Sequence, residues 1–262
     1  MGEAQAGSRA GDKLTVRATL LTLGLAFNVA ALAQHAGGGA LPMEPANTDV
    51  SDLAALQRGA KYFVNYCFGC HSAQYVRYNR LGADLGLTDA QLVENIMFTG
   101  ERPFDMMTNA MTDEDAAAWF GIAPPDLSLI ARSRGTDYLY NFLRGFYQDD
   151  TALSGANNLW LENTAMPHVL WELQGVRRAV FVDRDVDGVA VPTFEHFEPV
   201  SPGTLSEAEY DGLVRDIVTF LDYIGEPMQL ERRALGVRVI GFLLVFLLIA
   251  YMLKREIWKD VD

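Results

Sequence analysis

Apolar positions recur every three or four residues in several stretches of the chain, which is the spacing of one face of an α-helix. Polar capping residues precede most of these stretches. The last stretch is the best marked, because Ser206 and Glu209 have the spacing of a capping box, and Gly225 and Pro227 end the pattern. We expect helices over Ser51–Tyr66, Leu87–Gly100, Thr112–Gly121, Thr136–Gln148 and Ser206–Pro227.

Alternation of apolar and polar residues, which indicates a β-strand, is clear in one stretch. Residues Val180–Val191 have the pattern of strand, turn and strand, with Asp187 and Gly188 in the turn. The pattern therefore predicts a mostly α fold class with a small β-hairpin insertion.

A continuous apolar run near the C-terminus has the length of a membrane span. Ala234–Leu253 comprises 20 residues, which at about 1.5 Å per residue cover the roughly 30 Å hydrocarbon core. Arg238 lies near one end and can reach the interface, and Tyr251 and Trp258 suit the other headgroup layer. We predict one C-terminal transmembrane helix over residues 234–253; a buried core helix is the alternative.

The N-terminus has the features of a secretory signal peptide. Basic residues precede an apolar run that ends in Ala31, Leu32 and Ala33. We expect residues 1–33 to be the signal; an uncleaved anchor helix is the alternative.

The orientation of the C-terminal span depends on that signal peptide. Basic residues flank the span evenly, so flanking charge does not decide which end faces the cytoplasm. A domain over residues 34–233 would then lie in the periplasm, on the outer side of a bacterial inner membrane, and a tail over 254–262 in the cytoplasm.

Charge is distributed unevenly along the 262 residues. The formal net charge of the whole chain is −13, whereas residues 34–234 alone carry −15. A domain of that sign repels nucleic acid and attracts basic partners. Because 50% of the residues are hydrophobic, the chain can also form a folded core.

The chain contains two cysteines, Cys67 and Cys70, and His71 directly follows the second. C-x-x-C-H is the attachment signature of c-type haem. Two cysteines one helical turn apart can each form a thioether with a vinyl group of the porphyrin, and the histidine can reach the iron. We therefore predict one covalently attached haem c in a small, mostly helical domain.

Other chemistry is possible for the same motif. A thioredoxin-like redox site places it after a strand, whereas a helical pattern precedes it here. A zinc site would combine the three residues with an isolated fourth ligand such as His168. A structural disulfide would leave His71 without a role.

The iron of an electron carrier usually has a sixth ligand, and methionine opposite histidine raises its reduction potential. The candidates are Met97, Met106, Met107, Met111, Met166 and His168. The spacing typical of small soluble cytochromes favours Met106–Met111, whereas Pro167 holds the loop around Met166 out of helix. The local pattern leaves this choice open.

The order of segments resembles the cytochrome c1 family, the membrane-anchored haem subunits of ubiquinol-cytochrome c reductase (cytochrome bc1) complexes. The resemblance rests on "LQRGAKYFVNYCFGCHS" followed by "RYNRL", on "APPDLSLIARSRGTDYLYNFLRGFY", on a late methionine and on one C-terminal span. It extends from about Asp52 to Trp258. The string "PPDLS" followed by two spaced arginines is more specific than the haem motif.

The resemblance implies a cytochrome c-like haem domain and a role for several residues. Cys67 and Cys70 would hold the haem, and His71 and Met166 would be its axial ligands. Other residues would line the haem pocket, with an arginine and a tyrosine near a propionate: Pro124, Pro125, Arg134 and Tyr138. Many relatives have a proline pair shortly after the methionine, whereas this chain has one proline and then His168, which stays an alternative ligand.

The resemblance also implies the function of an electron-transfer subunit without bond chemistry of its own. It would take one electron from a Rieske iron-sulfur protein and pass it to a soluble cytochrome c, beside cytochrome b in a dimeric complex. An acidic stretch, Phe104–Trp119 or Val182–Glu198, would border the docking face for the basic carrier. The alternatives are a stand-alone membrane-anchored cytochrome that feeds an oxidase or reductase, and an anchored haem enzyme with an open sixth position.

Overall fold

The structure is a computed structural model that describes residues 41–186 and 189–259. Nearly all of these residues belong to one compact unit that begins at Met43. The signal peptide expected over residues 1–33 lies outside the described residues, as do the expected turn at Asp187 and Gly188 and the last three residues of the tail.

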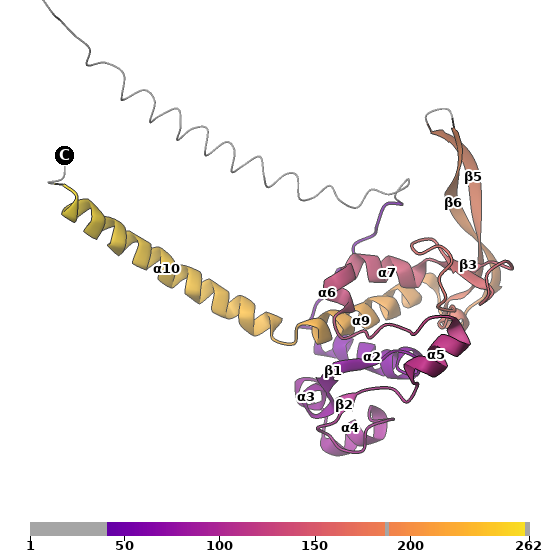
Figure 1. Cartoon of the computed structure of the whole chain (residues 1–262), viewed down its shortest axis with the longest axis horizontal. Helices are drawn as coiled ribbons and strands as arrows, with labels where there is room; N and C mark the ends of the chain where they lie inside the picture. The colour runs from indigo at the N-terminus through magenta and orange to yellow at the C-terminus, as the bar shows by residue number, and fades with distance from the viewer. Residues whose placement is uncertain (1–40, 187–188, 260–262) are drawn as a thin grey trace, which may run out of the picture. The chain divides into compact units, whose positions relative to one another are not determined.

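The regular structure of the described residues is mainly helical (Figure 1). The helices are α2 (Leu53–Tyr62), the π-helix η2 (Phe63–Cys67), α3 (Tyr78–Asp84), α4 (Asp89–Asn95), α5 (Asp113–Phe120), α6 (Ile130–Arg134), α7 (Thr136–Arg144), α8 (Trp171–Gln174), α9 (Glu207–Gly225) and α10 (Gln229–Ile257). Strands pair antiparallel as β1 (Ala73–Arg77) with β2 (Met106–Met107), β3 (Phe146–Gln148) with β4 (Ala156–Asn158), and β5 (Gly175–Val186) with β6 (Val189–Pro202). The predicted fold class, mostly α with a hairpin insertion, is confirmed.

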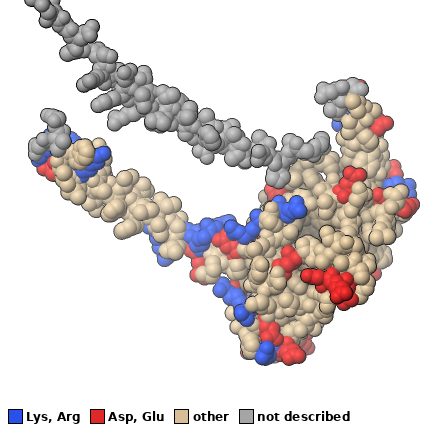
Figure 2. Space-filling view, in the orientation of Figure 1, with Lys and Arg blue, Asp and Glu red and all other residues tan. Residues whose placement is uncertain are grey.

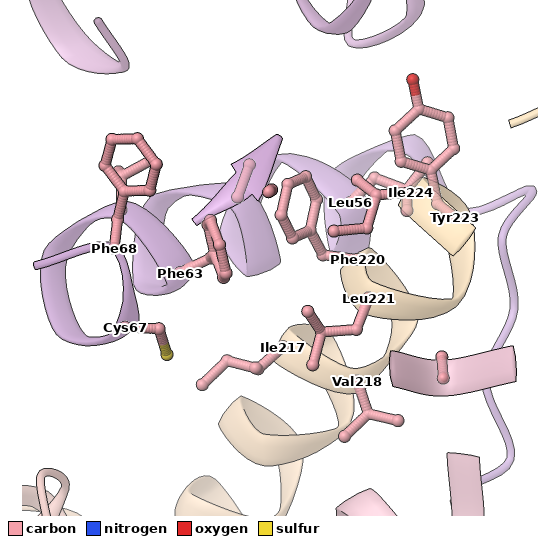
Figure 3. Packing of buried hydrophobic residues seen from close by; sticks show 14 of the residues in the cluster. Leu56, Phe63, Cys67, Phe68, Ile217, Val218, Phe220, Leu221, Tyr223 and Ile224 are labelled. Atoms are coloured by element: carbon pink, nitrogen blue, oxygen red, sulfur yellow. The ribbon is translucent and has the colours of Figure 1, made fainter. Parts of the chain in front are cut away.

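Helices α2 and α9 pack against each other in the hydrophobic core, where Phe63 and Phe220 lie with ring centroids 5.3 Å apart (Figure 3). Gly59 permits the close crossing, because a Cβ atom there would lie 2.1 Å from the backbone oxygen of Asp216. Arg58 donates two hydrogen bonds to the Asp216 carboxylate, at 2.6 and 2.9 Å. The helix that leads into the cysteine motif is therefore held along its length by α9.

Capping contacts confirm several predicted helix starts. Thr88 and Gln91 form a capping box before α4, and Ser206 and Glu209 form another before α9. The Thr112 side chain accepts a hydrogen bond from the third residue of α5. Each cap satisfies backbone N–H groups that the helix itself leaves unpaired, which is why these local signals suffice to place the helix starts.

The helix expected over residues 87–100 is shorter than its apolar pattern predicts. It ends at Asn95, because Ile96 leaves the helical conformation at φ −125°. Ile96 and Met97 are instead buried in the core. Packing of these two apolar side chains therefore prevails over continuation of the helix.

The helix expected over residues 136–148 also ends early, at Arg144, and Phe146–Gln148 form strand β3. Gly145 lies at the change of direction. A Cβ atom there would lie 2.7 Å from Cδ1 of Trp160, so the glycine makes room for that indole ring. The tertiary contact and the pairing of β3 with β4 end the helix.

The predicted hairpin is present and longer than expected over Val180–Val191, because β5 and β6 extend to both sides of it (Figure 1). Most residues of β6 are exposed, so the flanking parts have no buried face to impose an alternating pattern. The base of the hairpin contacts β3 of the helical part.

Helix α10 is, among the described helices, the one that is long and apolar enough to cross a membrane, with a window of mean hydropathy 2.4. It contains the predicted span over residues 234–253. Only Glu226–Met228 separate it from α9. The Glu226 carboxylate accepts hydrogen bonds from Arg132 of α6 and Arg232 of α10. A short, ion-paired connection therefore joins the apolar helix to the domain.

Substitution of Gly59 tests the packing of α2 on α9. The added Cβ atom of Gly59→Ala overlaps the backbone of α9, so we expect a loss of about 3 kcal/mol in the free energy of unfolding. Gly212→Ala is the matched control in α9, because nothing lies within 4 Å of a Cβ atom there. It should stabilise the helix by about 0.5–1 kcal/mol. Unfolding of the detergent-solubilised full-length protein measures both, and equal stabilities would contradict the close crossing.

Candidate functional site

The cysteine motif begins where a helix widens into a π-helical turn. α2 continues directly into η2, which ends at Cys67. The backbone N–H groups of Cys70 and His71 both donate to the carbonyl oxygen of Cys67, at 3.1 and 2.9 Å. π-Helical turns are rare and often occur at functional sites. One compact turn therefore presents the three residues of the motif, as their spacing predicts.

The two thiols of the motif are not joined, and Cys67 is buried. Burial, with a smaller effect of the neighbouring Cys70, raises the pKa of the Cys67 thiol to about 12. A redox-active cysteine has the opposite property, a lowered pKa that supplies thiolate. The geometry therefore gives no support to the disulfide or the thioredoxin-like interpretation, whereas a thioether requires no ionised sulfur.

A backbone carbonyl orients the His71 ring. Its Nδ1 atom lies 2.7 Å from the carbonyl oxygen of Pro125. A carbonyl oxygen only accepts hydrogen bonds, so Nδ1 carries the proton and donates it. Burial lowers the pKa of His71, although the bond to Pro125 and the charge of Asp126 oppose this effect. A neutral ring held in this way has its free lone pair on Nε2, as metal-ligating histidines do.

The segment that contains Pro125 is hydrogen-bonded along its length to the segment after His71. Three further bonds link them: Leu127 N–H to the Ser72 carbonyl (2.8 Å), Gln74 N–H to Asp126 Oδ2 (2.8 Å) and Tyr75 N–H to Ser128 Oγ (3.1 Å). Asp126 Oδ1 also accepts from the Ser128 N–H at 2.8 Å. Residues 54 positions apart are thereby fixed against each other, and the double proline is held beside the histidine.

Half-buried apolar side chains from several other segments pack against the hydrophobic core of the domain, which includes Cys67 and Phe68. Among them are Leu127, Ile130, Tyr138, Met166 and Val169. Side chains that pack on a core but keep part of their apolar surface uncovered suit a flat apolar ligand. Two unjoined thiols, a free histidine nitrogen and this lining are the groups that a covalently bound haem requires, so the residues present fit it.

The candidate methionines differ in burial. Met97 and Met107 are packed in the core, at 8% and 0% exposure, whereas Met106 is 45% exposed. Met166 is half-buried on the cluster that contains the first cysteine. Its N–H donates to Thr164 Oγ1 at 3.3 Å. Met166 therefore lies in an ordered, irregular loop beside the haem motif's cluster.

An aromatic ladder runs from Arg134 to His168. The Arg134 guanidinium lies 5.8 Å from the ring centroid of Tyr138. The rings of Tyr138, Phe142 and Phe146 follow at 6.0 and 5.2 Å, and Phe146 stacks on His168 at 5.0 Å with planes 2° apart. Continuous contact thus links the expected pocket residues of α6 and α7 with the loop after the expected methionine. This stacking gives His168 a packing role.

Sequence reasoning did not identify Phe142 and Phe146 as neighbours of the site. The spacing of four residues between Tyr138 and Phe142 was the available signal for Phe142, because it places both on one side of α7, whereas Phe146 lies beyond the end of that helix. No sequence pattern indicated that Asp126 and Ser128 support the site. Both bind the backbone of a segment about fifty residues away, and no local pattern encodes that contact.

These features define a class of protein: a c-type cytochrome with one haem motif at the end of a helix, half-buried apolar side chains on the core that contains its first cysteine, and a C-terminal helix of membrane-spanning length. The model of the Cytochrome C1 family matches residues 46–261. The chain belongs to this family.

Several relatives are similar in sequence to this chain over most of their length. The chain is 50% identical to cytochrome c1 of Allochromatium vinosum over 226 residues, which are 86% of this chain and 92% of the relative. It is 41% identical over 237 residues to a Nitrosomonas europaea protein named ammonia monooxygenase gamma subunit, covering 90% and 96%. Cytochrome c1 of Rhodospirillum rubrum is 30% identical over 236 residues, covering 80% and 83%.

Membership in the family establishes the cofactor and the activity. The chain carries one covalently bound c-type haem and is the electron-transfer subunit of a cytochrome bc1 complex, whose cytochrome b and Rieske iron-sulfur subunits are its partners. Bacterial members are membrane-anchored, and α10 is consistent with that anchor. The alternative of a stand-alone anchored cytochrome is not favoured.

Substitution of Asp126 tests the hydrogen bonds that hold the proline segment. Asp126→Ala leaves the Gln74 and Ser128 N–H groups without their acceptor, so we expect a loss of about 2 kcal/mol in the free energy of unfolding. Asp126→Asn keeps one acceptor oxygen and should lose less. Asp113→Ala, at the exposed start of α5, is the control and should cost less than about 1 kcal/mol. Urea unfolding of the solubilised haem protein measures all three. A loss in Asp126→Ala no larger than in the control would contradict the assigned role.

Proposed function

We propose that Cys67 and Cys70 hold the haem through thioethers and that His71 Nε2 and the Met166 sulfur are its axial ligands. The observation that carries this proposal is the hydrogen bond from His71 Nδ1–H to Pro125, which leaves Nε2 as the ligand atom. The bound haem supplies a one-electron couple between ferric and ferrous iron. The protein contributes the ligands, the burial of the haem and the charges around it.

The choice of Met166 is supported by its half-buried position and by the packing of its competitors. Met97 and Met107 fill the core, where they have their own apolar contacts. Methionine sulfur favours ferrous iron and so raises the reduction potential. A raised potential suits a subunit that accepts electrons from an iron-sulfur protein.

The remaining pocket residues act on the edge of the haem in this proposal. Pro124 and Pro125 line the side of the pocket where the His71 ring is bound. Arg134, exposed at the end of α6, lies over the Tyr138 ring, and a guanidinium stacked on a ring keeps its edge N–H donors directed outward. Such donors match a haem propionate, which Arg134 would neutralise with Tyr138 beside it.

The membrane arrangement follows from the two apolar segments. Residues 1–33 would direct export, residues 34–233 would form the haem domain on the periplasmic side, and residues 234–253 would span the inner membrane. Residues 254–262 would remain in the cytoplasm. The complex would be dimeric, as the resemblance to the family implies.

The electron would leave to a soluble, basic cytochrome c that docks beside α5. The first turn of α5 contains Asp113, Glu114 and Asp115, and acidic side chains gather there in Figure 2. Trp119 and Ile122, at 64% and 63% exposure, add apolar surface next to the acids. The hairpin stretch over 182–198 contains Arg184 and His196 among its acids, whereas residues 104–119 contain no basic residue, so α5 is the better of the two acidic docking surfaces.

Substitution of Met166 tests the sixth ligand. We expect Met166→Leu to lower the haem reduction potential strongly and to let carbon monoxide bind the ferrous haem, because the sixth position becomes open. Met106→Leu removes an exposed methionine and should leave both properties unchanged. Redox titration and the carbon monoxide difference spectrum measure them. An unchanged potential in Met166→Leu would eliminate this ligand.

Charge removal on α5 tests the docking surface. We expect the double variant Asp113→Asn/Glu114→Gln to reduce a basic soluble cytochrome c several-fold more slowly at low ionic strength, with a weaker dependence of the rate on salt. Both residues are exposed and Asp115, which accepts from the Thr112 hydroxyl, is left in place. Asp183→Asn/Glu195→Gln on the hairpin is the matched control. If both pairs behaved alike in stopped-flow kinetics, α5 would not be the docking surface.

A further inference from the structure

Three buried side-chain polar atoms of the described residues have no hydrogen-bond partner: His168 Nε2, Gln174 Oε1 and Arg177 Nε. They come from one neighbourhood, formed by the loop after Met166, the end of α8 and the start of β5. The three side chains therefore form one polar cluster, here called the distal cluster.

Arg177 is the charged member of the distal cluster. Its guanidinium donates to the carbonyl oxygens of Arg144 and Phe146 and lies 3.7 Å from the ring centroid of Phe197. Within the described chain, no carboxylate lies at ion-pair distance from it. Two acids lie in its surroundings, Glu207 and Asp211, and Asp211 is paired with Arg144 at 2.6 Å. A guanidinium stays protonated even when burial lowers its pKa, so a positive charge is fixed here.

The distal cluster borders the loop of the proposed methionine ligand. His168 is the second residue after Met166, and its ring stacks on Phe146. The carbonyl of that same phenylalanine accepts from Arg177. The charge of this half-buried arginine is therefore linked by direct contacts to both the loop and the aromatic ladder that begins at Arg134.

Electrostatics gives the charge a definite effect on the haem. Oxidation adds one positive charge to the iron, and a fixed positive charge in a low-dielectric environment disfavours that change. The groups bound to the Arg177 guanidinium are neutral carbonyls and an aromatic ring, which do not cancel its charge. A buried water bound to the unpaired atoms would satisfy them and also leave the charge in place.

We propose that Arg177 is a positioning and tuning residue whose fixed positive charge raises the reduction potential of the haem from the methionine side. This inference rests on the proposed function, since it takes Met166 as the sixth ligand. It assigns to the distal cluster the role of setting how readily the subunit accepts an electron.

The experiment compares Arg177→Gln, Arg177→Lys and Arg178→Gln in the full-length chain, purified within its complex. Redox titration of the c-type absorption band gives the potential, and the methionine-iron charge-transfer band of the ferric protein reports ligation. In Arg177→Gln we expect the reduction potential to fall. At a fixed ambient potential, the ratio of ferric to ferrous haem should then rise by about threefold or more. Arg177→Lys keeps the charge and should stay near the wild type. Arg178 is exposed, so its loss should have no effect.

Each outcome decides the proposal. An unchanged potential in Arg177→Gln with the methionine band retained would overturn it. A fall accompanied by loss of the band would overturn it as well, because loss of the ligand would then explain the change. Absence of the band from the wild-type protein would instead refute the assignment of Met166.

A second variant covers the case in which Arg177→Gln does not accumulate as a haem protein. Gln174→Glu keeps the size of the side chain and adds a carboxylate to the distal cluster without removing the contacts of Arg177. A negative charge beside the half-buried guanidinium offsets it, so the potential should again fall with the methionine band retained. A potential equal to that of the wild type would contradict the proposed role of the charge.

Discussion

The hydrogen bond between the His71 ring and the Pro125 carbonyl is the contact on which the haem site depends. It selects the tautomer of the histidine and joins the turn after η2 to the segment before α6. Neither segment is regular at that point, so each needs support from the core. α9 provides it, because α2 and α6 both pack against this one helix. The position of the nitrogen proposed as the ligand is therefore set by tertiary packing that the C-x-x-C-H motif itself does not contain.

The sequence predicted those features that depend on local chemistry. The capping boxes at Thr88 and Ser206 and the turn at Cys67 involve residues three or four positions apart, so a pattern reveals them. The predicted helix ends were wrong where distant contacts prevail. Ile96 is buried in the core, and Gly145 makes room for an indole ring. The local pattern could not choose among the methionines for the same reason, since the burial of Met97 and Met107 in the core is a property of the fold.

Acidic and basic side chains gather on different parts of the molecule. Acidic side chains gather over α5, whereas basic side chains gather where α10 begins (Figure 2). At that junction Glu226 accepts hydrogen bonds from Arg132 and Arg232, so part of the basic charge is used to attach the apolar helix. The acidic first turn of α5 favours contact with basic partners.

Electron transfer changes the charge of the haem without making or breaking a bond to the protein, so fixed charges and dipoles are the means by which this chain acts on the reaction. An arginine near the propionates and a half-buried one near the methionine would have different effects. Arg134 would pair with a carboxylate, and the two charges largely cancel. Arg177 is bound by neutral carbonyls and an aromatic ring, which lower the cost of burying it but leave its field in place. A half-buried cation without a carboxylate at ion-pair distance is costly to the fold, and its effect on the haem potential would be a reason to keep it.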